Sequence, residues 1–152
     1  MIVTEKSTLI RRPVEEVFRY VSHMEYLPEW GEGVVASKQI SGLEPGPGAI
    51  YRCTISPAFA GLGITGEYRM EEFEADRKLV CRLNSSMVDF EDIYLFDETP
   101  EGTRFRVRNS IKLSLFLVPA GILVSAVVRD RITRAHEKLI ARLEGTSRKR
   151  TA

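Results

Sequence analysis

Hydrophobic and polar residues follow two different periods along this 152-residue chain. Between residues 13 and 30 apolar residues recur about every 3.6 positions, which predicts two short helices, at 13–21 and 23–30. From residue 34 to 113 the period is two, which predicts strands. The helical period then returns and continues to residue 144. The pattern indicates an α+β protein that ends in a long helix.

The region of period two divides into six strands, and a first strand precedes the two short helices. Most of the links are short and rich in turn residues, as in Pro45-Gly46-Pro47-Gly48, which favours antiparallel neighbours joined by hairpins. We therefore expect a seven-stranded antiparallel sheet. A longer apolar link at 57–63 is typical of a mobile flap over a pocket or of a widened hairpin. The strands are predicted at 2–10, 34–41, 49–56, 64–75, 79–85, 90–97 and 103–112.

The last predicted strand has one apolar face and one basic face. Phe105, Val107, Ile111 and Leu113 alternate with arginine, serine and lysine, and Asn109 is the one polar residue in the apolar row. The strand at 90–97 is ambiguous, because apolar residues occur on both of its faces. Its buried side is left open by the pattern.

The C-terminal helix is predicted to have two different halves. Residues 113–128 carry no charge, and Pro119 suits a first helical turn, whereas Gly145 suits the position just past the helix end. Beyond residue 129 the helix is amphipathic and should pack on a core. The first half is apolar nearly all round, so protein, lipid or a bound apolar ligand must cover it. It is shorter than the roughly 20 residues of a bilayer span, so we expect no stable membrane insertion.

Composition narrows the classes of function. The net charge of +1 argues against nucleic-acid binding, and the basic run at 148–150 belongs to a tail, 146–152, that we expect to be disordered. Residues 1–145 are then a single domain. The first residues lack the apolar region of a signal peptide, and two cysteines on different strands are best interpreted as reduced thiols. We expect a cytoplasmic monomer or homodimer.

Local motifs resemble one known superfamily. They are Pro13-x-Glu-Glu-Val-Phe-x-Tyr-Val21, a short polar stretch closed by Trp30, Pro45-Gly46-x-Gly48 before a strand, and Gly102-Thr103-Arg104 at the start of the last strand. Their order resembles the START-like (SRPBCC) superfamily, which includes the polyketide cyclase/dehydrase and lipid-transport proteins. This resemblance implies a helix-grip fold, in which a curved antiparallel sheet wraps the C-terminal helix around a cavity for an apolar or amphipathic ligand.

Metal, phosphate and acyl-enzyme chemistry have little support in the sequence. His23 and His136 lie on separate predicted helices, where we interpret the first as a surface or capping residue and the second as solvated. No metal-ligand spacing, phosphate loop or nucleophile elbow accompanies them. We therefore predict no metal and no cofactor.

Three polar residues on inward-facing rows are the catalytic candidates. A buried Asp92 with a raised pKa could act as a general base, while Tyr94 or Asn109 donates a hydrogen bond to a developing enolate. The alternative is structural: Asp92 pairs with an arginine of a neighbouring strand, and the other two complete hydrogen bonds in the core.

The main functional hypothesis is binding or carriage of a hydrophobic or amphipathic small molecule, such as a lipid or polyketide, between the sheet and the helix. A cyclase-like enzyme acting in the same cavity is the first alternative. The second is a protein- or membrane-interaction module that uses the apolar surface of 113–128. The ligand-binding candidates are Trp30, Tyr51, Tyr68, Met70, Tyr94, Asn109, Ile122, Leu123 and Ala126.

Overall fold

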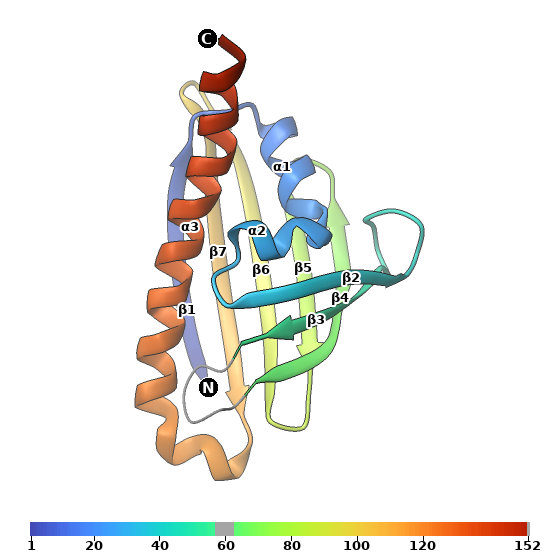
Figure 1. Ribbon diagram of the computed structural model, residues 1–152, viewed down its shortest axis with the longest axis vertical. Helices are drawn as coiled ribbons and strands as arrows, with labels where there is room; N and C mark the ends of the chain where they lie inside the picture. Colours follow the sequence, from blue (N-terminus) through green and yellow to red (C-terminus); the bar gives the residue numbers. More distant parts are fainter. Residues whose placement is uncertain (57–62, 152) are drawn as a thin grey trace.

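The chain folds into one curved antiparallel sheet of seven strands that packs against a long C-terminal helix (Figure 1). A computed structural model describes residues 1–56 and 63–151. The strand order is β1-β7-β6-β5-β4-β3-β2, so each strand from β2 to β7 lies beside its neighbour in sequence, and β1 is added next to β7. The predicted α+β helix-grip architecture is confirmed. The strands are β1 Ile2–Ile10, β2 Val34–Ser41, β3 Ile50–Ile55, β4 Ile64–Glu74, β5 Lys78–Asn84, β6 Val88–Thr99 and β7 Gly102–Leu113.

Short helices connect β1 to β2, and a longer helical segment follows β7. The first group is α1 Val14–Ser22, η1 Met24–Tyr26 and α2 Leu27–Trp30, and the second is η2 Leu115–Ala120 and α3 Gly121–Thr151. The apolar face predicted for α1 is buried, and His23 caps the C-terminal end of this helix. Most strand bounds differ from the predicted ones by one or two residues.

The predicted ends of the C-terminal helix are wrong at both positions. Pro119 lies inside η2, and α3 begins two residues later, at Gly121. Gly145 lies within α3, which continues to Thr151 through most of the tail that was predicted to be disordered. Glycine costs a helix only about 1 kcal/mol relative to alanine, and no proline follows it to stop the helix.

The sheet curves because its ladders contain irregularities. Register shifts occur twice between β2 and β3, and once between β4 and β5, where Met70 and Glu72 pair with successive residues of β5. Bulges of this kind bend a strand and increase its twist. The curvature lets α3 contact both β1 and α2.

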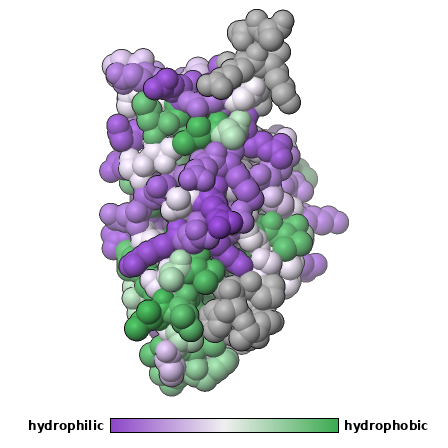
Figure 2. All heavy atoms as spheres, turned by 60° about the vertical axis from the view of Figure 1, so that its left-hand side comes forward, coloured by the Kyte–Doolittle hydropathy of each residue, from purple (hydrophilic) through white to green (hydrophobic). Residues whose placement is uncertain are grey.

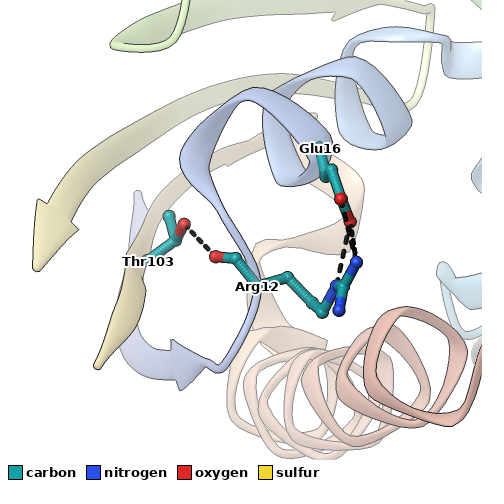
Figure 3. A network of polar contacts seen from close by, with 3 residues as sticks. All are labelled: Arg12, Glu16 and Thr103. Atoms are coloured by element: carbon teal, nitrogen blue, oxygen red, sulfur yellow. Dashed lines mark hydrogen bonds and ion pairs between the residues drawn. The ribbon is translucent and has the colours of Figure 1, made fainter. Parts of the chain in front are cut away.

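A polar network joins the β1–α1 corner to the start of β7 (Figure 3). The Thr103 hydroxyl donates to the Arg12 carbonyl at 2.8 Å, while the Arg12 guanidinium pairs with Glu16 one helical turn into α1. Gly102, with φ of +146°, leaves room for the backbone of this corner. The network ties the start of α1 to the start of β7.

Buried side chains form two separate clusters. The larger joins α1, α2 and the second half of α3 to the sheet, around Phe18, Phe105 and Leu139. The smaller contains Val88, Ile111 and Leu117, below the first half of α3. The residues on which the flap prediction rests, 57–62, lie outside the described ranges.

Candidate ligand-binding cavity

A cavity of about 210 Å³ lies between the sheet and α3. Residues of both clusters line it, so the core is divided where the cavity sits. An empty apolar cavity of about 150 Å³ is large enough to hold benzene in other proteins. This one therefore has room for a larger ligand, of the size of a fused two-ring aromatic compound.

The cavity wall carries one connected polar network, built from three strands. Asp92 lies on β6 directly opposite Asn109 on β7, and Tyr68 reaches across β5 from β4. The Tyr68 hydroxyl is 2.5 Å from Asp92 Oδ2, Asn109 Nδ2 is 2.5 Å from Asp92 Oδ1, and the Tyr68 and Tyr94 hydroxyls are 2.8 Å apart. All four residues line the cavity. The inward face of β6, which the sequence left open, is the face that carries Asp92 and Tyr94.

The direction of these hydrogen bonds follows from the number of hydrogens. Tyr68 donates its single hydroxyl hydrogen to Asp92, so in the Tyr68–Tyr94 contact the hydrogen comes from Tyr94. Asn109 donates through its amide nitrogen. Every hydrogen bond of the network thus points toward the Asp92 carboxylate.

Burial controls the ionisation of the network. It raises the pKa of Asp92, and the hydrogen bonds from Tyr68 and Asn109 partly oppose this by stabilising the anion. Burial, followed by the nearby Asp92 charge, raises the pKa of Tyr68 and of Tyr94 well above the usual range. Both tyrosines are therefore neutral donors. The prediction that Asp92 pairs with an arginine is wrong, because its hydrogen-bond partners are a tyrosine and an asparagine.

Apart from Glu32 Oε2, which forms an ion pair with Lys138, two polar atoms of the lining are buried and lack a hydrogen-bond partner among the described residues. One is Asn109 Oδ1, an acceptor, and the other is Trp30 Nε1, a donor. A buried polar atom left unpaired costs about 1–3 kcal/mol. Ligand or water in the cavity could remove this cost.

The lining changes character along the inward row of β7. At the level of Phe105 to Asn109 it includes Trp30, Tyr94, Asp92 and His136, whereas around Ile111 and Leu113 it is apolar. The apolar end is completed by Ile64, Leu83, Met87, Val88, Phe90, Leu117, Val124, Val127 and Val128. The cavity therefore has one polar end and one apolar end.

His136 lines the cavity, although the sequence pattern predicted a solvated side chain. It is only 2% exposed, its Nδ1 is 2.8 Å from the Thr8 hydroxyl, and its ring lies against Phe105. Burial, with a smaller contribution from Lys6, lowers its pKa from 6.5 to about 4, so the imidazole is neutral at physiological pH. The interpretation of His136 as solvated is wrong. Its spacing of four residues from Ile132 and three from Leu139 places it on the buried face of the helix.

The structure divides the predicted ligand-binding residues into three groups. Trp30, Tyr68, Tyr94 and Asn109 line the cavity. Tyr51 and Met70 are buried in the larger cluster and do not line it. The other three, Ile122, Leu123 and Ala126, are not part of the lining, and Ile122 and Leu123 are exposed on the outer side of α3.

The helix contributes a different set of side chains from the predicted one. Its lining residues are Val124, Val127, Val128, Arg131, Ile132, Ala135 and His136. Their spacing of three and four residues defines one helical face. The prediction failed for Ile122, Leu123 and Ala126 because a run that is apolar all round does not show which face turns inward.

The exposed part of this run forms an apolar surface at the end of the molecule where η2 leads into α3 (Figure 2). Leu115 is 91% exposed and Ile122 is 87% exposed, and Phe116, Val118 and Leu123 are also exposed. In the described part of the chain no helix is long and apolar enough to cross a membrane. The hypothesis of an interaction module that uses 113–128 stays a prediction.

The structure gives little support for a catalytic nucleophile or a metal site. Cys53 and Cys81 are free and buried, and burial raises the pKa of both thiols. Across residues 1–56 and 63–151, no three His, Cys, Asp or Glu side chains are grouped so as to hold a metal ion. The polar network around Asp92 is therefore the candidate site.

The fold has the helix-grip architecture of START-like proteins. The sequence matches the family model described as polyketide cyclase / dehydrase and lipid transport over residues 1–144. The chain belongs to this family, as its motifs predicted. A search of curated proteins finds no match.

Solved structures share this fold at low sequence identity. The protein TTHA0849 from Thermus thermophilus superposes with a TM-score of 0.80 at 17% identity, covering 95% of this chain and 99% of that one. A START superfamily protein from Mycobacterium smegmatis gives 0.76 at 14% identity, covering 96% and 99%. The di-domain ARO/CYC protein StfQ, from the steffimycin biosynthetic pathway, gives 0.74 at 12% identity, and the match covers 96% of this chain and 52% of StfQ.

Proposed function

We propose that the protein binds or carries a hydrophobic or amphipathic small molecule in the cavity between the sheet and α3. The observation that supports this most directly is a space of about 210 Å³ between the sheet and α3, which residues of both packed clusters border and which is lined mainly by apolar side chains. Protein interiors are normally packed to the density of organic crystals. A ligand would supply the van der Waals contacts that the side chains around this space lack.

The lining also sets the orientation of the bound molecule. Its apolar body lies against Ile111, Leu113 and Leu117, where water would make no hydrogen bonds. Its polar group lies at the other end, near Asn109 and Tyr94. An amphipathic ligand with one polar end matches this arrangement better than a hydrocarbon does.

Native mass spectrometry of the gently purified protein tests the proposal without assuming a ligand. A co-purifying small molecule that organic extraction removes is the expected result. As a defined probe, 2-methoxynaphthalene fits the cavity by size, and its own fluorescence reports binding.

A pair of helix variants tests whether such a probe binds inside the cavity. Ala135 lines the cavity, whereas Ala141 is exposed on the same helix. Ala135→Leu places three additional carbons in the cavity and should weaken probe binding about tenfold or more, a loss of at least about 1.4 kcal/mol. Ala141→Leu makes the same chemical change outside it and should leave binding unchanged. Equal affinity in both variants would contradict the proposal.

A cyclase-like enzyme is the second candidate, and the raised pKa of the buried Asp92 favours it. Against it, the hydroxyl hydrogens of Tyr68 and Tyr94 are already directed toward Asp92, so neither tyrosine has a hydrogen left to donate to an enolate. Replacing Asp92, Tyr94 and Asn109 singly with alanine separates the two functions. Loss of turnover of a poly-keto substrate, with little change in ligand affinity, would favour the enzyme.

A further inference from the structure

Beside Asn109 and Tyr94 the cavity offers hydrogen-bond acceptors. Asn109 donates to Asp92 Oδ1 at 2.5 Å, so its amide oxygen faces away from that carboxylate, and this oxygen is buried without a partner among the described residues. Tyr94 donates its hydroxyl hydrogen to Tyr68, which leaves lone pairs on its own oxygen. A ligand group placed here meets oxygen lone pairs from both residues.

The same network makes this end unfavourable for an anion. Both oxygens of Asp92 accept hydrogen bonds, from Tyr68 and Asn109, so this carboxyl group turns lone pairs and not a hydrogen toward its surroundings. Among the described lining residues Arg131 is the one basic side chain besides the neutral His136, and it donates to the carbonyl and hydroxyl oxygens of Ser56 at the end of β3. A carboxylate beside Asn109 would lie next to Asp92 and would face the lone pairs of Asn109 Oδ1 and of the Tyr94 hydroxyl.

Resting on the proposed function, we infer that the cavity selects ligands with a neutral hydrogen-bond donor at their polar end, such as an alcohol or a phenol. The hydroxyl donates to Asn109 Oδ1, while the apolar body fills the end near Leu117. Trp30 Nε1 gives the lining a donor of its own, so the same ligand can carry an ether or carbonyl oxygen elsewhere. The cavity excludes ligands that would place an anion beside Asp92.

Three ligands with the same ring system test this inference on the unmodified protein. They are 2-naphthol, which donates a hydrogen bond, 2-methoxynaphthalene, which does not, and 2-naphthoate, which is an anion at neutral pH. Titration calorimetry at pH 7 should show 2-naphthol binding about tenfold tighter than 2-methoxynaphthalene, the value of one net hydrogen bond. 2-Naphthoate should bind more weakly than both.

Variants locate the hydrogen bond. Asn109→Leu removes the acceptor, so the ratio of the 2-naphthol and 2-methoxynaphthalene affinities should fall from about tenfold to about one. Ile111→Val, on the same inward row of β7, removes one methylene from the apolar end. It should weaken both ligands by the same factor and keep the ratio. The ligand comparison alone remains decisive if Asn109→Leu does not fold.

The outcomes separate this inference from the proposed function. Equal binding of 2-naphthol and 2-methoxynaphthalene would overturn the donor selectivity and leave the hydrophobic cavity intact. If 2-naphthoate bound more tightly than the other two ligands, and Arg131→Gln removed this preference, the polar end of the ligand would lie at Arg131. This result would also overturn the donor selectivity. Binding of none of the three to the folded protein would count against the proposed function itself.

Discussion

His136 should make the protein sensitive to mild acid. The imidazole lies on the buried face of α3 and is hydrogen-bonded to Thr8 of β1, and burial lowers its pKa from 6.5 to about 4. In the unfolded chain the same group takes up a proton near pH 6.5. As pH falls below this value, His136 is protonated in the unfolded chain but stays neutral in the folded protein. The free energy of unfolding therefore decreases until His136 of the folded protein is also protonated, near pH 4.

The magnitude follows from the two pKa values. At about pH 5 the unfolded histidine is almost fully protonated while the folded one is mostly neutral, which costs about 2 kcal/mol. At about pH 4 the cost reaches about 3 kcal/mol, a large part of the roughly 5–15 kcal/mol that is typical of a whole domain. Above about pH 7.5 His136 is neutral in both states, so its protonation no longer affects the free energy of unfolding.

Urea unfolding of the wild type and of His136→Gln, each at pH 7.5, 5 and 4, measures this effect. Glutamine retains a polar group that can reach Thr8 but does not titrate in this range. Other groups titrate equally in both proteins, so the difference in unfolding free energy isolates His136. The wild type should lose about 2 kcal/mol more than the variant between pH 7.5 and pH 5. Parallel losses in both proteins would refute the reasoning.

Three further substitutions test the network and one turn. Asp92→Asn should gain stability relative to the wild type as pH rises above about 4, because burial raises the pKa of Asp92 and its charge costs folding energy; unfolding curves at pH 4 and 8 show whether the difference grows. Tyr68→Phe should cost about 1–3 kcal/mol, since Asp92 and Tyr94 each lose a partner, and an unchanged urea midpoint would argue against the network. Gly102→Ala should lower the melting temperature, because a Cβ there would lie 2.8 Å from Arg11 Cα at a φ of +146°; a melting temperature equal to that of the wild type would show that the corner can move.

The fold was largely predictable because the period of the hydrophobic residues changes twice. Alternation predicted the six strands from β2 to β7, β-branched residues predicted β1, and the inward row of β7 correctly included Asn109. The face of β6 was not predictable, because Ile93 and Leu95 make its outer side apolar as well. The inward face of the first half of α3 could not be predicted for a related reason. Ile122 and Val124 are equally apolar, and only tertiary packing decides which of them faces the cavity.

The polar network was partly predictable. Asn109 could be selected as the polar residue of the inward row of β7, and Asp92 and Tyr94 as polar residues that share one of the two faces of β6. Asp92 and Asn109 meet directly across neighbouring strands. The hydroxyl of Tyr68 reaches Asp92 across β5, a contact between strands that are not adjacent. Strand order and curvature determine it, and neither can be obtained from local spacing.

A crystal structure of the protein with 2-naphthol tests the central claim most directly. We expect electron density for one molecule between the sheet and α3, with its hydroxyl within hydrogen-bond distance of Asn109 Oδ1 and its rings near Leu117 and Val124. Density only on the outer surface at Leu115 and Ile122, with the interior unchanged, would contradict it.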